Sequence, residues 1–441
     1  DSLTFVTERY DSTMGETVFN RSVLPPYQSI VDTEEWAVGS FAQISWRRTL
    51  SEKSEMTLQT YYDHRHRHAF LYDSFSVDTV DLDFQHAFKV GKRNDIVWGL
   101  GYRHNSDEME NGFSISLNPT ERTQHWVGAF VQDEIALIPD SLYLTVGSKF
   151  EHNSFSAQSV EFQPNVRLRW NTGETGTAWA SISRAIRLPS RGDLDGRVVS
   201  AVLPPVGPPN TAPIPLVIGA QGNPDLLSEE LIAYEVGYRI QPTDDLALDV
   251  ALFLHDHDKE RSLGQGIPVC VPSGVPIYVD PLCVLAAQYI DSPFPLDNRG
   301  TNESYGIEAF ADWTPTSWWR LQTAYSSLRF RDRAAPATPT SDALTQDSPE
   351  HQLSIRSLMN FGSNTEFDLW LRFTDELENI GVDSYLTLDA RLAWSPTPRL
   401  RLSVVGRNLF DDAHQEFVSE IRDVVPVQLE RRAYLEASWN F

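Results

Sequence analysis

Apolar and polar residues alternate along this chain in segments of about ten residues each, and this pattern recurs roughly eighteen times. Between Leu386 and Trp394 every second side chain is apolar, whereas Thr387, Asp389 and Arg391 lie between them. A period of two residues is typical of β-strands with one apolar and one polar face. Because the pattern runs from one end of the chain to the other, the sequence predicts an all-β protein.

The connections between these segments are alternately short and long. Transmembrane β-barrels have short turns at the periplasmic end and longer loops at the extracellular end. We therefore predict an antiparallel transmembrane β-barrel of about eighteen strands, whose first strand starts at the periplasmic end. A β-sandwich would also alternate apolar and polar residues, but it gives no reason for the loop lengths to alternate. The expected short turns lie near residues 50–54, 91–94, 138–141, 171–176, 241–244, 314–317, 361–364 and 395–398, and the long loops near 10–34, 63–74, 106–122, 154–160, 188–227, 259–299, 331–348, 376–381 and 411–430.

Composition excludes two other classes. Of the 441 residues, 41% are hydrophobic, yet no apolar run reaches the roughly 18 residues that a membrane-spanning helix needs. The net charge of −25 argues against nucleic-acid binding, which requires a basic surface. We attribute this acidity to lumen and loop surfaces, either for solubility alone or to attract cations.

Three motifs in a fixed order resemble the barrel of TonB-dependent outer-membrane receptors. They are SRAIRLPS at residues 183–190, GNPDL at 222–226 followed by YEVGY at 234–238, and NLFD at 408–411 ahead of a last strand that ends on Phe441. Pro189 and Pro224 also have a simpler interpretation as residues that end or interrupt strands. The opening strands from Leu3 onward are similar to the middle of such receptors, so the resemblance spans essentially the whole chain.

The resemblance implies a globular plug domain, a segment ahead of it that contacts TonB, and a barrel of about twenty-two strands. Plug, TonB segment and roughly four strands have no counterpart here, so residues 1–441 are expected to be one partial barrel without a plug. The chain opens in strand pattern at Leu3 and shows no signal peptide, so we expect a mature form or a fragment of a longer receptor.

The function implied is TonB-energised uptake of a scarce solute through the outer membrane of a Gram-negative bacterium. The favoured substrate is a ferric siderophore, and the other candidates are cobalamin, haem and a carbohydrate. The expected partners are TonB, through the plug, outer-membrane lipid and the barrel-assembly machinery, for which Phe441 resembles the insertion signal. The alternatives are a passive diffusion porin and a surface adhesion barrel. No motif of a hydrolase, metalloprotease, nucleotide-binding or dinucleotide-binding enzyme occurs, so we expect no enzyme and no cofactor.

Candidate ligand-binding residues lie near expected outer strand ends. Arg184, Arg187 and Arg191 form a basic cluster that would suit the carboxylates or catecholates of an anionic siderophore. Alternatively, they pair with the many acidic residues. His64, His66 and His68 share one face if their strand stays extended, and three convergent imidazoles could bind zinc, copper or haem iron. Alternatively, the three histidines are solvated polar residues at the base of a loop.

Two further pairs of residues are candidates for metal or disulfide chemistry. His255 and His257 are weaker metal candidates at another outer strand end. Cys270 and Cys283, the only two cysteines, lie in one Pro-rich loop, where an oxidising compartment would join them as a local disulfide. The other possibility is two free thiols.

Overall fold

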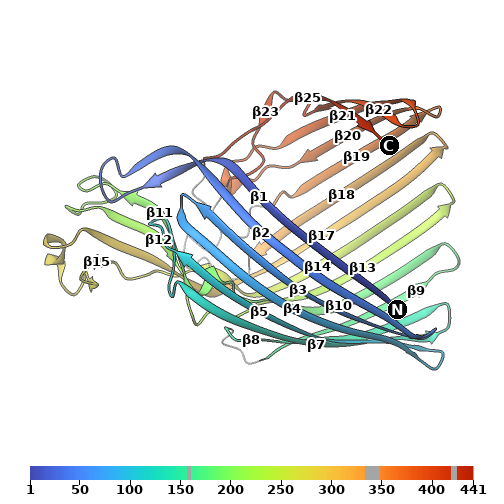
Figure 1. Cartoon of the computed structure of the whole chain (residues 1–441), viewed down its shortest axis with the longest axis horizontal. Helices are drawn as coiled ribbons and strands as arrows, with labels where there is room; N and C mark the ends of the chain where they lie inside the picture. Colours follow the sequence, from blue (N-terminus) through green and yellow to red (C-terminus); the bar gives the residue numbers. More distant parts are fainter. Residues whose placement is uncertain (156–159, 333–347, 419–424, 441) are drawn as a thin grey trace.

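A single antiparallel sheet curls around a lumen in the computed structural model, which describes residues 1–155, 160–332, 348–418 and 425–440 (Figure 1). Eighteen long strands of this described part each pair with the next, which confirms the predicted fold class. They are β1 (Ser2–Arg21), β2 (Gln28–Ser51), β3 (Ser54–Ala69), β4 (Tyr72–Val90), β5 (Asn94–Glu110), β7 (Glu121–Ile138), β8 (Leu142–Asn153), β9 (Glu161–Asn171), β10 (Gly176–Arg187), β13 (Glu229–Thr243), β14 (Leu246–Leu263), β17 (Tyr289–Thr316), β18 (Trp319–Asp332), β19 (His351–Phe361), β20 (Thr365–Thr374), β21 (Tyr385–Thr397), β22 (Leu400–Arg407) and β25 (Arg432–Trp439).

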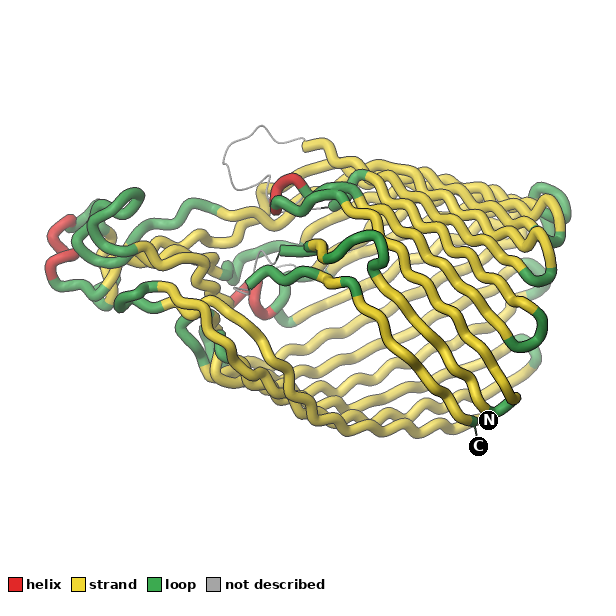
Figure 2. Tube along the Cα trace, turned by 90° about the horizontal axis from the view of Figure 1, so that it is seen from above, coloured by secondary structure: helices red, strands yellow, loops and turns green. Residues whose placement is uncertain are grey.

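Some of the shorter elements, among them β11, β12 and β15, build an extension beyond one end of the barrel, seen at the left of Figures 1 and 2. There β12 runs parallel to the start of β17 and antiparallel to β11, and Val199, Val202 and Val217 form a small buried cluster. None of the helices among the described residues is long and apolar enough to span a membrane. The shorter elements are β6 (Ile115–Leu117), α1 (Arg191–Asp195), β11 (Gly196–Leu203), β12 (Leu216–Gln221), β15 (Val269–Val271), β16 (Val275–Pro276), η1 (Pro281–Leu285), η2 (Glu378–Ile380), β23 (Ala413–His414) and β24 (Leu429–Glu430).

The continuous register shows which side chains face the lumen. Arg167, Trp179 and Asp249 line the central cavity, so residues in register with them face inward. Their neighbours along the strands face outward, and among these Val250 and Leu392 are 41% and 49% exposed. Successive side chains of a strand point to opposite faces, so an apolar outer face and a polar lumen follow from the two-residue period.

The short turns lie where the sequence predicts them, at the end opposite the extension. Gly91 and Gly362 adopt positive φ angles of 64° and 68° in two of these turns. Glycine adopts this left-handed conformation without the steric cost that a Cβ atom would impose.

Several expected long loops are strand for much of their length. Residues 10–34 were expected to connect two strands, but β1 and β2 stay paired as far as Arg21 and Gln28. The pairing continues because polar cross-strand contacts, such as the 2.8 Å hydrogen bond from Thr17 Oγ1 to Asp32, replace the apolar face. The loop expected at 63–74 shrinks to a turn after Ala69 for the same reason, and the loops expected at 188–227 and 259–299 contain short strands and helices. Most of the expected loop 331–348 and Phe441 lie outside the described residues.

The two outermost strands of the sheet expose their edges. β1 pairs with β2 and β25 with β22, and no register joins β1 to β25 in the part of the chain that the structure describes. All residues of β25 and the first fourteen of β1 are exposed on both faces. Unpaired N–H and C=O groups along a strand edge are templates for further strand pairing.

Candidate functional site

The lumen contains a cavity of about 1260 Å³ between β9 and β20. Guanidinium groups stack on aromatic rings in its wall: Arg167 lies 4.8 Å from the ring centre of Trp179, and Arg372 lies 4.3 Å from that of Trp370. Arg372 also pairs with Asp389 at 3.0 Å, whereas Arg167 has no carboxylate partner among the described residues. An arginine guanidinium can stack on an aromatic face and still present its donors to planar anionic groups.

The basic cluster that the sequence singles out lies at the outer end of the barrel, where register places Arg187 on the lumen face of β10 and Arg184 on the opposite face, and it is neutralised by acids. Arg184 contacts Glu161 at 3.4 Å and Glu230 at 3.1 Å, and Arg187 contacts Glu229 at 3.0 Å. The ion-pairing alternative therefore describes how both residues are placed.

Arg191 is the most enclosed member of the cluster, with only 10% of its side chain exposed. It begins α1 and donates to Asp107 on β5 at 3.1 Å and to Asp195. Asp195 also pairs with Arg122 on β7 at 2.6 Å. Since Asp107 and Arg122 face the lumen, these contacts hold α1 against the lumen side of β5 and β7.

The first turn of α1 is fixed by a capping box. Ser190 donates its backbone N–H to Asp193 at 2.9 Å, and the Ser190 hydroxyl accepts from the Asp193 N–H at 3.1 Å. Burial disfavours the charged form of Asp193, but the hydrogen bonds from Ser190 and the nearby Arg261 outweigh it and lower the pKa of this carboxyl. Asp193 therefore stays ionised and keeps α1 anchored down to acidic pH.

The GNPDL motif fixes the position of the long loop that contains α1. Gly222 lies so close to α1 that an added Cβ would come within 2.7 Å of the Leu194 carbonyl carbon. Asn223 accepts from the N–H of Asp225 at 3.0 Å and donates to the Leu296 carbonyl at 3.0 Å. The motif thus ties the loop to α1 on one side and to β17 on the other.

The three histidines of β3 share one face, as expected, but this face points away from the lumen. His64 and His66 lie opposite Asp78 and Ser76 of β4 and contact them at 2.9 and 2.6 Å, and His68 approaches Asp73 at 3.5 Å. Each imidazole therefore has its own partner. The described residues contain no group of three or more His, Cys, Asp or Glu side chains that could hold a metal ion.

His255 and His257 face the lumen near its outer end. Their rings are 6.3 Å apart; His255 approaches Glu235 at 3.7 Å, and His257 contacts Ser304 at 3.0 Å. His257 therefore has a hydrogen-bonding partner, whereas His255 Nε2 is buried without one among the described residues and has only the longer electrostatic contact with Glu235.

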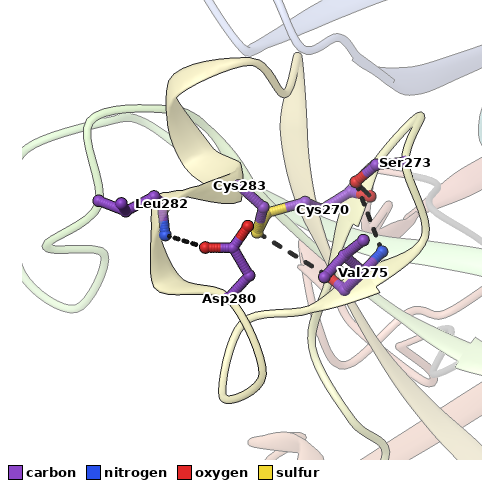
Figure 3. Close-up of a disulfide and its surroundings, with 6 residues drawn as sticks. All are labelled: Cys270, Ser273, Val275, Asp280, Leu282 and Cys283. Carbon is purple, nitrogen blue, oxygen red and sulfur yellow. Dashed lines mark hydrogen bonds between the residues drawn. A yellow bond between two sulfur atoms is a disulfide. The ribbon is translucent and has the colours of Figure 1, made fainter.

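Cys270 and Cys283 are joined by a disulfide bond in the extension (Figure 3). Next to it, the Asp280 side chain accepts from the Leu282 N–H at 3.0 Å, and Ser273 Oγ donates to the Cys270 carbonyl at 3.1 Å. Disulfide and hydrogen bonds together close a small loop that projects from the barrel.

Replacing both cysteines with serine should release this loop without unfolding the barrel. Closing a loop of about 15 residues is worth roughly 3 kcal/mol on the chain-entropy estimate, and the strand ladder does not depend on it. Limited proteolysis should therefore cut residues 264–288 faster in the variant, while the barrel keeps its heat-resistant mobility in gel electrophoresis. Cleavage at an unchanged rate would show that the hydrogen bonds alone hold the loop.

Sequence reasoning missed the partners that define this site. Asp107, Arg122 and Glu161 lie in strands far from the arginine cluster in sequence, and Trp179 and Trp370 carry no motif. Register could have placed them, because residues opposite one another share a face.

A family model described as TonB dependent receptor-like, beta-barrel, matches residues 4–409. The chain belongs to this family. A search of curated protein sequences found no match.

Solved structures of TonB-dependent receptors share the fold. The ferric enterobactin receptor PfeA from Pseudomonas aeruginosa has a TM-score of 0.67 at 12% identity, with 91% of this chain and 61% of that one covered. The siderophore receptor PirA from Acinetobacter baumannii has a TM-score of 0.66 at 11% identity, with 99% and 71% covered. The ferric-catecholate import receptor Fiu from E. coli has a TM-score of 0.64 at 12% identity, with 92% of this chain and 64% of that one covered. The chain thus spans 61% of the length of PfeA.

Proposed function

We propose that this barrel is the wall of a TonB-dependent receptor that imports a ferric siderophore, most suitably a catecholate, across the outer membrane of a Gram-negative bacterium. The observation that carries the proposal is the aromatic lumen wall, where Arg167 and Arg372 stack on Trp179 and Trp370 and Arg167 has no carboxylate partner among the described residues. A catecholate complex offers both flat rings and negative charge, which such a wall attracts. The structures of similar fold include receptors for ferric enterobactin and ferric catecholates, which supports this choice.

The proposed transport runs in steps that the barrel alone does not complete. Outer loops and the apex of a plug capture the ligand, TonB then pulls on the plug from the periplasm, and the solute passes through the lumen. The barrel supplies the wall, the charge of the mouth and the selectivity loops. Cobalamin, haem or a carbohydrate is the competing substrate.

We further infer that strands beyond those described here close the barrel between β25 and β1. The exposed edges of both strands support this inference, because an open sheet edge cannot be satisfied in hydrocarbon, where no water bonds to the free backbone groups. The barrel that includes these further strands would then be the partner of both the barrel-assembly machinery and the plug.

Replacing Arg167 with alanine should slow uptake of a ferric catecholate. The lost interaction between cation and ligand is worth about 1–2 kcal/mol when desolvated, or roughly a five- to thirtyfold lower rate at limiting substrate. The measurement is uptake of radioactive iron by cells that carry the full-length receptor.

Arg329→Ala is the matched control for this experiment. Arg329 faces outward on β18 and contacts Glu350 at 3.5 Å, so it lies off the transport path. Equal uptake by the parent and the Arg167 variant, or an equal loss in both variants, would contradict the role proposed for the lumen wall. Binding assays of the full-length receptor with ferric siderophores, cobalamin and haem identify the substrate class.

A further inference from the structure

Two histidines meet on the outer surface of the barrel, on the face opposite the lumen and below the mouth. His104 of β5 and His125 of β7 are direct cross-strand partners, and their Nδ1 atoms are 3.4 Å apart. The hydroxyl of Tyr102 converges on the same point, 2.9 Å from His125 Nδ1. Three polar atoms from two adjacent strands therefore face one small volume.

The separation of the two nitrogens fits a shared metal ion better than a hydrogen bond. Hydrogen bonds from nitrogen to oxygen span about 2.7–3.2 Å, and this nitrogen–nitrogen contact of 3.4 Å lies near the outer limit of hydrogen bonding. Zinc binds imidazole nitrogens at about 2.0–2.1 Å with tetrahedral angles, which places two donors about 3.3–3.4 Å apart. In a square-planar complex, neighbouring ligands are at right angles. With similar bond lengths, two such nitrogens would be only about 2.9 Å apart.

Among the described residues, the polar contacts of His125 Nδ1 are the Tyr102 hydroxyl and His104 Nδ1, the same groups that would share the ion. Neither His104 nor His125 has a carboxylate partner in the described ranges, unlike His64, which is paired with Asp78. His125 is exposed, and His104 is half-buried. A neutral imidazole can present Nδ1 to a metal while it keeps its proton on Nε2, so both rings can ligate through Nδ1.

The site lies at the outer edge of the apolar surface, where water can reach it. Along β5, Leu100 and Tyr102 precede His104, and Ser106 and Glu108 follow it on the same face. Water can therefore complete the coordination.

We propose that His104 and His125 bind a divalent transition-metal ion, zinc by geometry, with the Tyr102 hydroxyl or water as further ligands. The ion bridges β5 and β7 and keeps open positions toward the outside. This site is independent of the transported ligand, because it lies on the opposite face of the wall.

The chain provides a matched control that lacks only the second imidazole. Tyr325 and His351 repeat the geometry of Tyr102 and His125: hydroxyl to Nδ1 is 3.0 Å, and the ring centres are 6.1 Å apart, compared with 2.9 and 6.2 Å. The position that corresponds to His104 is Ser327, the register partner of His351.

The test is a titration of the detergent-extracted receptor with Zn²⁺ alone, in competition with a chromophoric chelator. His104→Ala and His125→Ala should each lower the affinity of one Zn²⁺ equivalent at least tenfold, and the double variant should lose no more than that equivalent. His351→Ala should change nothing, and Ser327→His should add one equivalent.

Heat-resistant gel mobility verifies that each variant is folded, and His104→Gln and His125→Gln replace any alanine variant that is not. The proposal is overturned if the parent binds no Zn²⁺ that the His104 and His125 variants lose, or if Ser327→His gains none.

Discussion

Replacing Arg191 with methionine should detach α1 and its long loop from the mouth. The substitution leaves the carboxylate of Asp107, which is 7% exposed, without the guanidinium that contacts it at 3.1 Å. Breaking a buried ion pair by removing one partner costs about 3–5 kcal/mol. The cost should appear as local opening, because the ladders of β5 and β7 do not depend on α1. Hydrogen exchange of the backbone amides of residues 190–226 measures this local opening. These amides should exchange at least a hundredfold faster in the variant than in the parent.

Arg187→Met is the control for this prediction. Arg187 belongs to the same cluster, but 54% of its side chain is exposed, and its pair with Glu229 is screened by water. Such pairs contribute about 0–1 kcal/mol. Similar exchange rates in the two variants would show that Arg191 does not anchor the loop.

An arginine at Val250 should destabilise the barrel, whereas one at the adjacent Ala251 should be tolerated. Val250 lies in the middle of the apolar outer face of β14, and Ala251 lines the cavity opposite Glu308. Arginine on the lipid face near the bilayer midplane costs about 2–4 kcal/mol, while lumen substitutions mainly tune selectivity. The free energy of unfolding in lipid vesicles, from urea titration, distinguishes the two variants. Equal losses, or a larger loss for Ala251→Arg, would mean that the faces are assigned the wrong way round.

The strands could be predicted from sequence because their outer face must stay apolar. The alternation between Leu386 and Trp394 falls within β21, and the chain reverses between Thr397 and Leu400, next to the turn expected at 395–398. The same criterion fails beyond the apolar band. There β1 and β2 continue as a polar ribbon that needs no apolar face, so the residues from Tyr10 onward resembled a loop.

The candidate site was only partly predictable, because it depends on register. The spacing of His64, His66 and His68 places them on one face, but a shift of one residue in register decides whether that face is the lumen or the outside. Similarly, the partner of Arg191 on β5 lies 84 residues away in sequence, so local spacing indicates a basic cluster but not its neutralisation.

Iron uptake with and without TonB tests most directly whether this barrel belongs to an energised importer. Cells that carry the full-length receptor should accumulate a ferric siderophore at limiting concentration, and accumulation should fall to background when TonB is deleted. The purified receptor should show no large steady conductance in a planar bilayer. Uptake that persists without TonB, together with such a conductance, would contradict the proposal and identify a passive porin.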